Sequence, residues 1–148
     1  MQSDRDVILA LEEQVGCYRR LAKLAEAQHE HVQQSRTEAL LDVLKSRQLV
    51  LDQLARLENV ILPAKKRWNE FVGQLEPAQR DSAETMVGES RRLLEQIVSS
   101  DRNDALVLQQ RKLNLGREIK QASSARQINR TYATAAYGRK VARVDVQQ

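Results

Sequence analysis

The sequence predicts an all-α protein, an elongated antiparallel helical bundle or coiled coil of three to four long helices with a mobile C-terminal tail. Apolar residues recur at alternating steps of three and four, which is the spacing of a helix seam. The 148 residues include only five Gly and two Pro, which are too few for the many tight turns of a sheet protein. One Phe, one Trp and three Tyr leave burial to aliphatic side chains, which favours helix packing.

Residues 8–32 and 40–61 are expected to form the main seam of this bundle. Apolar residues of the first segment follow a 3.5-residue period, and a leucine stripe marks the second. Ser35 and Glu38, which lie between the two segments, fit a capping box at the start of the second helix. The expected seam residues are Ile8, Leu11, Val15, Tyr18, Leu40, Leu44, Leu51, Leu54 and Ile61.

The remaining chain is expected to be helical but interrupted. Pro63 lacks an amide hydrogen, so the second helix either ends there or kinks. Residues 99–101 (Ser-Ser-Asp) supply N-cap candidates for a last helix that begins near Arg102. The apolar stripe of that helix fades after Ala122. We therefore expect a helical bundle over residues 1–122 and a basic, weakly apolar tail over 123–148, mobile until a partner orders it.

Positive charge is concentrated near the C-terminus. Residues 111–148 hold nine basic and two acidic residues, a net charge of +7 against +4 for the whole chain, which leaves −3 for residues 1–110. Such a segment can neutralise phosphates, so a nucleic-acid-binding helical protein is one alternative. The charges are spread about every four residues, without a helix-turn-helix or RNA-binding signature. This spacing favours a solvated helical surface.

The sequence offers no group of residues suited to catalysis. His29 and His31 are the only histidines, and on a helix they point about 200° apart, which excludes the shared face of an i, i+4 metal pair. The lone Cys17 has no disulfide partner within the chain, which fits a reducing cytoplasm. No apolar run reaches the ~20 residues of a membrane span. We expect no catalytic or metal residue, no cofactor, no small-molecule substrate and no membrane insertion.

Three stretches of the chain resemble the FlgN family of flagellar export chaperones. They are VILALEEQVGCYRRLAKLAEAQHEHV, then SRTEALLDVLKSRQLVLDQLARLE, and the closing TYATAAYGRK. The resemblance is best over residues 5–60, looser over 77–120 and short at the tail. It implies a cytoplasmic chaperone that holds hook-filament junction proteins (FlgK and FlgL in the family) before type III export. It also implies that a C-terminal tyrosine docks on the export gate, a role that Tyr132 and Tyr137 both match by position.

The predicted mechanism is helix packing. An open bundle can accept the amphipathic terminal helix of a client as its missing helix. A coiled-coil adaptor is a second alternative, although an adaptor is expected to keep its heptads beyond Ala122. Self-association stays open, as does the reading of the two tyrosine rings as tethers that fold back on the bundle. The candidate client-binding residues are Leu108, Leu115, Ile119 and Ile128.

Overall fold

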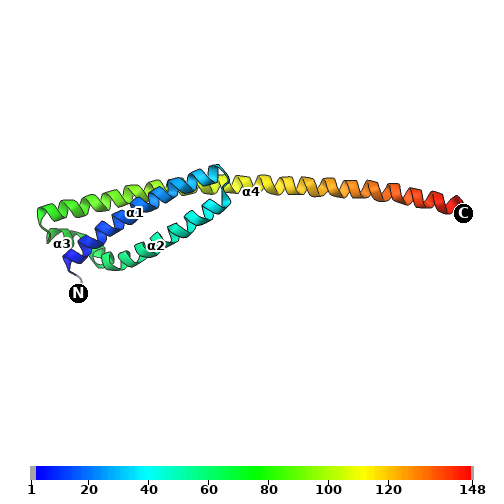
Figure 1. Cartoon of the computed structure of the whole chain (residues 1–148). Coiled ribbons are helices and arrows are strands. Elements are labelled where there is room, and N and C mark those ends of the chain that lie inside the picture. The colour runs from blue at the N-terminus through cyan, green and yellow to red at the C-terminus, as the bar shows by residue number, and fades with distance from the viewer. Residues whose placement is uncertain (1–2, 148) are drawn as a thin grey trace. The chain divides into compact units, whose positions relative to one another are not determined.

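The computed structural model describes the backbone of residues 3–147 and the side chains of residues 3–136. These residues form four helices and no strand, which confirms the all-α prediction. The helices are α1 (Asp4–Gln33), α2 (Thr37–Lys66), α3 (Trp68–Gly73) and α4 (Pro77–Gln147), labelled in Figure 1. The chain divides into two compact units, with the division between Val107 and Leu108. Unit 1 contains α1, α2, α3 and the first part of α4, and unit 2 contains the rest of α4.

Unit 1 is a helical bundle in which α1 contacts both α2 and the first part of α4 (Figure 1). Side-chain bonds from Gln14 to Glu58 and from Arg47 to Gln28 show that α1 and α2 run antiparallel. The buried apolar side chains come from all of these helices. The largest of those that are fully buried are Leu11, Leu21, Ile61 and Val32.

The predicted seam is confirmed in part. Leu11, Val15, Leu54 and Ile61 are buried, and Ile8, Tyr18 and Leu40 are partly buried. Leu44 and Leu51 were wrongly placed in the seam, since their exposed fractions are 44% and 42%. The core-facing residues of α2 lie at alternating steps of three and four, and they are Leu40, Val43, Arg47, Val50, Leu54, Leu57 and Ile61. A charged residue, Arg47, therefore occupies a seam position, and the leucines on either side of it, Leu44 and Leu51, are exposed.

The turn between α1 and α2 differs from the predicted capping box. Ser35 has a φ of 56°, its amide donates to the carbonyl of Val32, and the amide of Arg36 donates to that of His31. This is the hydrogen-bond pattern of a Schellman motif, with Ser35 in the position that usually holds glycine. Ser35 therefore ends α1, and α2 begins after Arg36 without a side-chain cap. A capping box does exist at the start of α1, between Ser3 and Asp6.

The structure has fewer helix breaks than the sequence predicts. The helix α2 continues through Pro63 to Lys66, so the proline does not end it. The expectation that a new helix begins near Arg102 is wrong, because α4 is continuous through residues 99–101. Ile97 and Asp104 are buried on either side of that segment, so packing keeps it helical. The helix also continues through 123–147, and every described side chain from Lys112 to Ala136 is exposed.

Candidate functional site

A cluster of polar side chains joins three helices inside unit 1. Asp101 accepts hydrogen bonds from the two terminal guanidinium nitrogens of Arg47, Nη1 and Nη2, each at 2.7 Å. Gln28 accepts from Arg47 at 2.6 Å and donates to Asp104 at 3.1 Å. His29 Nδ1 lies 2.7 Å from the other Asp104 oxygen. The cluster therefore connects α1, α2 and α4, and each polar group satisfies another that burial would otherwise leave unpaired.

Pairing with Asp101 stabilises the ionised form of Arg47. The hydrogen bonds to Asp101 raise the pKa of Arg47 above its usual value, although burial acts in the opposite direction. The carboxylate of Asp104 belongs to a residue only 1% exposed, and Gln28 and His29 hold its two oxygens. Within the described residues, no group of three or more His, Cys, Asp or Glu side chains is arranged to hold a metal ion. We interpret the cluster as a structural connection, because its hydrogen bonds join α1, α2 and α4.

The spacing of the two histidines excluded a metal pair, but the partner of His29 was not predicted. The signal was weak, because Asp104 lies 75 residues away from His29 in the chain. The one pattern that points to Asp104 is its spacing. Asp104 continues a series of residues at seven-residue intervals, and all members of the series are buried: Ala83, Ser90, Ile97 and Asp104. The Nδ1 atom of His31 is buried without a hydrogen-bond partner among the described residues.

The predicted client-binding residues lie in unit 2, on exposed helix surface. Leu108, Leu115 and Ile119 have exposed fractions of 42%, 57% and 61%. Steps of seven and four residues place these three side chains on one face of α4. Ile128, 55% exposed, follows Ile119 by nine residues, which turns it to the opposite face of the helix. The structure therefore groups three of the four candidates and separates Ile128 from them.

The seven-residue spacing of α4 extends from unit 1 into this surface. Leu94 and Asp101 in unit 1 are followed, at the same interval, by Leu108 and Leu115 in unit 2. In unit 1 Asp101 pairs with Arg47 of α2. In unit 2 no described residue buries Leu108 or Leu115. The seven-residue pattern of α4 thus continues into residues whose side chains are exposed.

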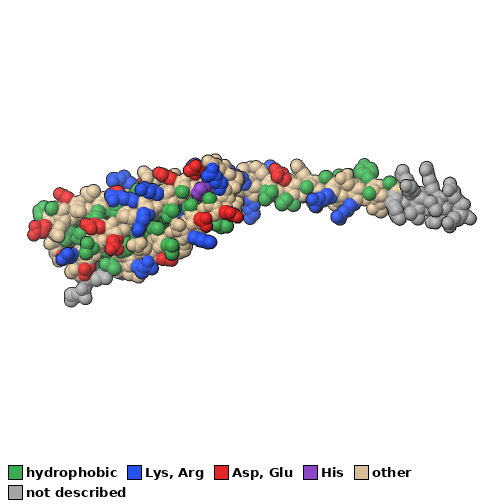
Figure 2. Space-filling view, viewed as in Figure 1, with side chains coloured by type: hydrophobic (Ala, Val, Ile, Leu, Met, Phe, Trp, Pro, Cys, Tyr) green, Lys and Arg blue, Asp and Glu red, His purple; other side chains and the backbone are tan. Residues whose placement is uncertain are grey.

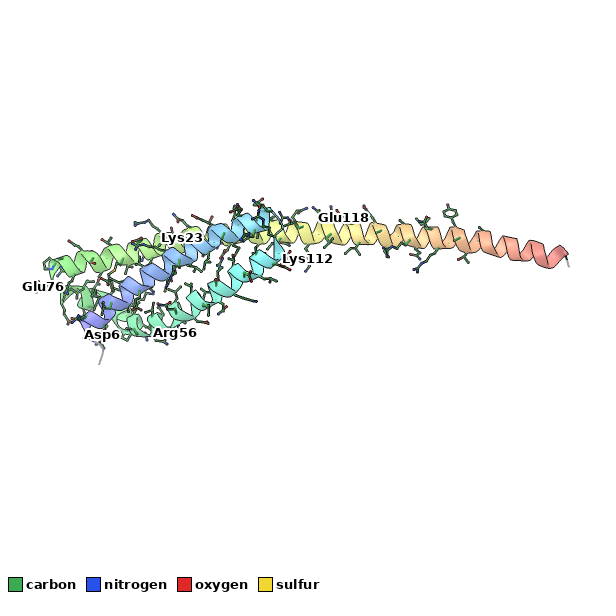
Figure 3. The ribbon with its side chains drawn as sticks, viewed as in Figure 1. Asp6, Lys23, Arg56, Glu76, Lys112 and Glu118 are labelled. Atoms are coloured by element: carbon green, nitrogen blue, oxygen red, sulfur yellow. The ribbon has the colours of Figure 1, made fainter. Side chains whose placement is uncertain are left out.

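Basic side chains flank this apolar face. Residues 108–136 contain one acidic residue, Glu118, and six basic residues: Arg111, Lys112, Arg117, Lys120, Arg126 and Arg130. Figure 2 shows apolar and basic side chains interspersed along this part of α4, and Figure 3 labels Lys112 and Glu118 on it. Arg111 and Lys112 border the face of Leu108, Leu115 and Ile119, whereas Arg117 lies on the opposite side of the helix.

Of the two candidate docking tyrosines, the structure describes the side chain of Tyr132. Tyr132 is 73% exposed. It lies four residues after Ile128, and the two side chains therefore share a face of α4. The side chain of Tyr137 lies outside the described residues.

Comparison with known proteins identifies no relative of this chain. No protein-family model, curated protein or solved structure matches it. None of the helices in the described residues combines the length and the apolar character needed to cross a membrane.

Proposed function

We propose that this chain is a helix-binding export chaperone of the FlgN type, and that client helices pack on the exposed face formed by Leu108, Leu115 and Ile119. One observation carries the proposal: three large aliphatic side chains at seam spacing stay between 42% and 61% exposed. Large aliphatic side chains that share one exposed face mark an interaction surface more often than isolated ones do.

The size of this surface suits reversible binding. Complete burial of a Leu or Ile side chain contributes ~1.5–3 kcal/mol, and roughly half of each side chain is still available here. The three residues together would contribute ~3 kcal/mol before the ordering cost of the partner. Affinity must therefore come from a longer contact along the helix, and release needs no large rearrangement. A chaperone that passes its client to an export gate requires that balance.

The proposed clients are hook-filament junction proteins like FlgK and FlgL, held by an amphipathic terminal helix. The basic flanks of the surface favour a client helix with acidic residues beside its apolar stripe. The proposed docking residues for the export gate are Tyr132 and Tyr137. Tyr132 is large and exposed, as expected of an interface anchor.

Isothermal titration calorimetry with a purified junction protein from the same genome tests this proposal. Leu115→Asp places a charge in the apolar face and is expected to weaken binding at least tenfold. Leu113→Asp is the matched control, because Leu113 is similarly exposed, at 52%, but lies on another face of α4. Equal effects of the two variants, or no binding by the unaltered chain, would reject the proposed surface.

Salt dependence separates this function from nucleic-acid binding. Binding of a client helix to the apolar face should weaken only modestly between 50 and about 200 mM salt, whereas an interface of several phosphate contacts loses orders of magnitude in affinity over that range. Tight, steeply salt-dependent binding to duplex DNA or RNA would favour the nucleic-acid alternative. Tyr132→Ala is expected to weaken binding to an export-gate component and to leave the melting temperature unchanged.

A further inference from the structure

Unit 1 contains a cleft of ≈ 300 Å³ between α2 and α4 that the proposed function does not use. Leu11 and Tyr18 of α1 line it, with Ile61 of α2 and Leu94 of α4 on opposite sides and Trp68 at the start of α3. Its volume and its predominantly apolar lining match those of small-molecule sites. The cleft lies wholly within unit 1, so it is separate from the surface on residues 108–136.

One buried polar group in the lining lacks a partner. Ser90 is only 7% exposed, and its hydroxyl makes no hydrogen bond. An unpaired buried hydroxyl costs free energy, and buried polar groups in folded proteins almost always have a partner. Ser90 belongs to the lining of the cleft, so a ligand there can supply the missing hydrogen bond.

The charged groups of the lining are both basic. Arg91 and Lys65 contribute from α4 and α2. Lys65 already pairs with Glu58 at 3.0 Å. Arg91 is exposed, and within the described residues it has no hydrogen-bond or ion-pair partner. The cleft therefore has an apolar interior and one available cation, which is complementary to an anion with an apolar body.

We propose that the cleft binds a small amphipathic anion of the medium-chain carboxylate class. Its apolar body lies against Leu11, Ile61 and Leu94, and its carboxylate pairs with Arg91. The hydroxyl of Ser90 donates a hydrogen bond to a ligand oxygen. This site is a binding site and not a catalytic one, and it goes beyond the proposed function.

The chain contains its own reporter for this site. Trp68 is the only tryptophan, and it lines the cleft, so its fluorescence reports on occupancy without a label. The experiment titrates the full chain with decanoate below its micelle concentration and follows the emission of Trp68. Decyltrimethylammonium, a cation with the same chain length, is the ligand control. The proposal predicts a saturable change with one decanoate per chain, and at least fivefold weaker binding of the cation.

Two neighbouring arginines give matched variants. Arg91→Gln should weaken decanoate binding at least fivefold, and Arg92→Gln should not, because both residues are exposed but Arg92 is absent from the lining. Ser90→Leu should fill the cleft and abolish binding. Circular dichroism tests whether the Ser90→Leu variant folds. If this variant does not fold, the comparison of the two arginine variants still decides the outcome. Equal binding of decanoate and the cation, equal effects of the two arginine variants, or no saturable signal would each overturn the proposal.

Discussion

Arg47 of α2 and Asp101 of α4 form a bidentate ion pair, in which the Nη1 and Nη2 atoms of Arg47 each lie 2.7 Å from a carboxylate oxygen. The pair occupies positions that seam residues would fill in an apolar bundle. The side chains of Arg47 and Asp101 are 12% and 34% exposed, so solvent screens the pair only in part. A polar pair at a seam position can fix the register of two helices, at some cost in stability.

Removing one partner of this pair should destabilise unit 1. Asp101→Ala leaves the guanidinium of Arg47 largely buried and without its carboxylate, which is expected to lower the free energy of unfolding by ~2 kcal/mol. Urea denaturation followed by circular dichroism measures the loss. The double variant Arg47→Met, Asp101→Leu should recover most of it, because an apolar pair of similar size leaves no unpaired charge.

The Arg19–Glu89 pair supplies the control. It also has two hydrogen bonds, at 2.8 and 2.9 Å, but the side chain of Arg19 is 61% exposed. Arg19→Ala should therefore change stability less than Asp101→Ala does. If the two single substitutions had the same effect, burial would not be what distinguishes the pairs.

Ser35→Gly should stabilise the protein. Ser35 has a φ of 56°, a left-handed conformation that glycine adopts without strain, and its amide already serves the Schellman motif. The relief of backbone strain is expected to outweigh the entropic cost of the more flexible unfolded chain. The free energy of unfolding should therefore rise by ~0.5–1 kcal/mol. Thermal denaturation measures it, and Ser46→Gly, an exposed position inside α2, should instead lower the melting temperature.

Two leucines of α2 test the corrected seam. Leu57 is 8% exposed and Leu51 is 42% exposed, although the sequence pattern had placed Leu51 in the seam. Leu57→Ala should cost ~2–3 kcal/mol of stability, and Leu51→Ala less than ~1 kcal/mol. Both variants are measured by urea denaturation. The reverse order would mean that α2 is rotated relative to the arrangement described above.

Tyr18 should make stability depend on alkaline pH. Burial raises the pKa of its phenol, and the negative charge of Glu58 raises it further. A raised pKa in the folded state means that the stabilisation is complete below the unfolded pKa of about 10 and is lost as pH rises through the folded pKa. The free energy of unfolding should therefore fall with pH above ~10. The free energy of unfolding of the Tyr18→Phe variant should fall less steeply over the same range. Identical slopes for the two proteins would contradict the burial of this phenol.

The fold class and most of the first two helices follow from the sequence, because aliphatic residues at steps of three and four dominate α1 and α2. The sequence failed where polar residues serve the core. Arg47 and Asp104 were not predicted as core residues, since their partners lie on other helices and no local pattern reveals them. Residues 99–101 resemble a helix start, but tertiary packing around Ile97 and Asp104 overrides that local preference.

The candidate site was predictable to a similar degree. Leu108, Leu115 and Ile119 were identified because their spacing is regular. Ile128 was grouped with them by composition alone, and its nine-residue offset from Ile119 places it on the other face of α4. The cleft beside Trp68 could not be predicted, because it depends on how far α2 and α4 stand apart.

Hydrogen–deuterium exchange of the chain with and without a purified junction protein tests the central claim most directly. If client helices pack on the face of Leu108, Leu115 and Ile119, amide exchange over residues 108–122 should slow at least tenfold in the complex. The Leu113→Asp variant should show the same protection and Leu115→Asp should not. Protection confined to α1 and α2, or unchanged exchange over 108–122 in a saturated complex, would contradict the account.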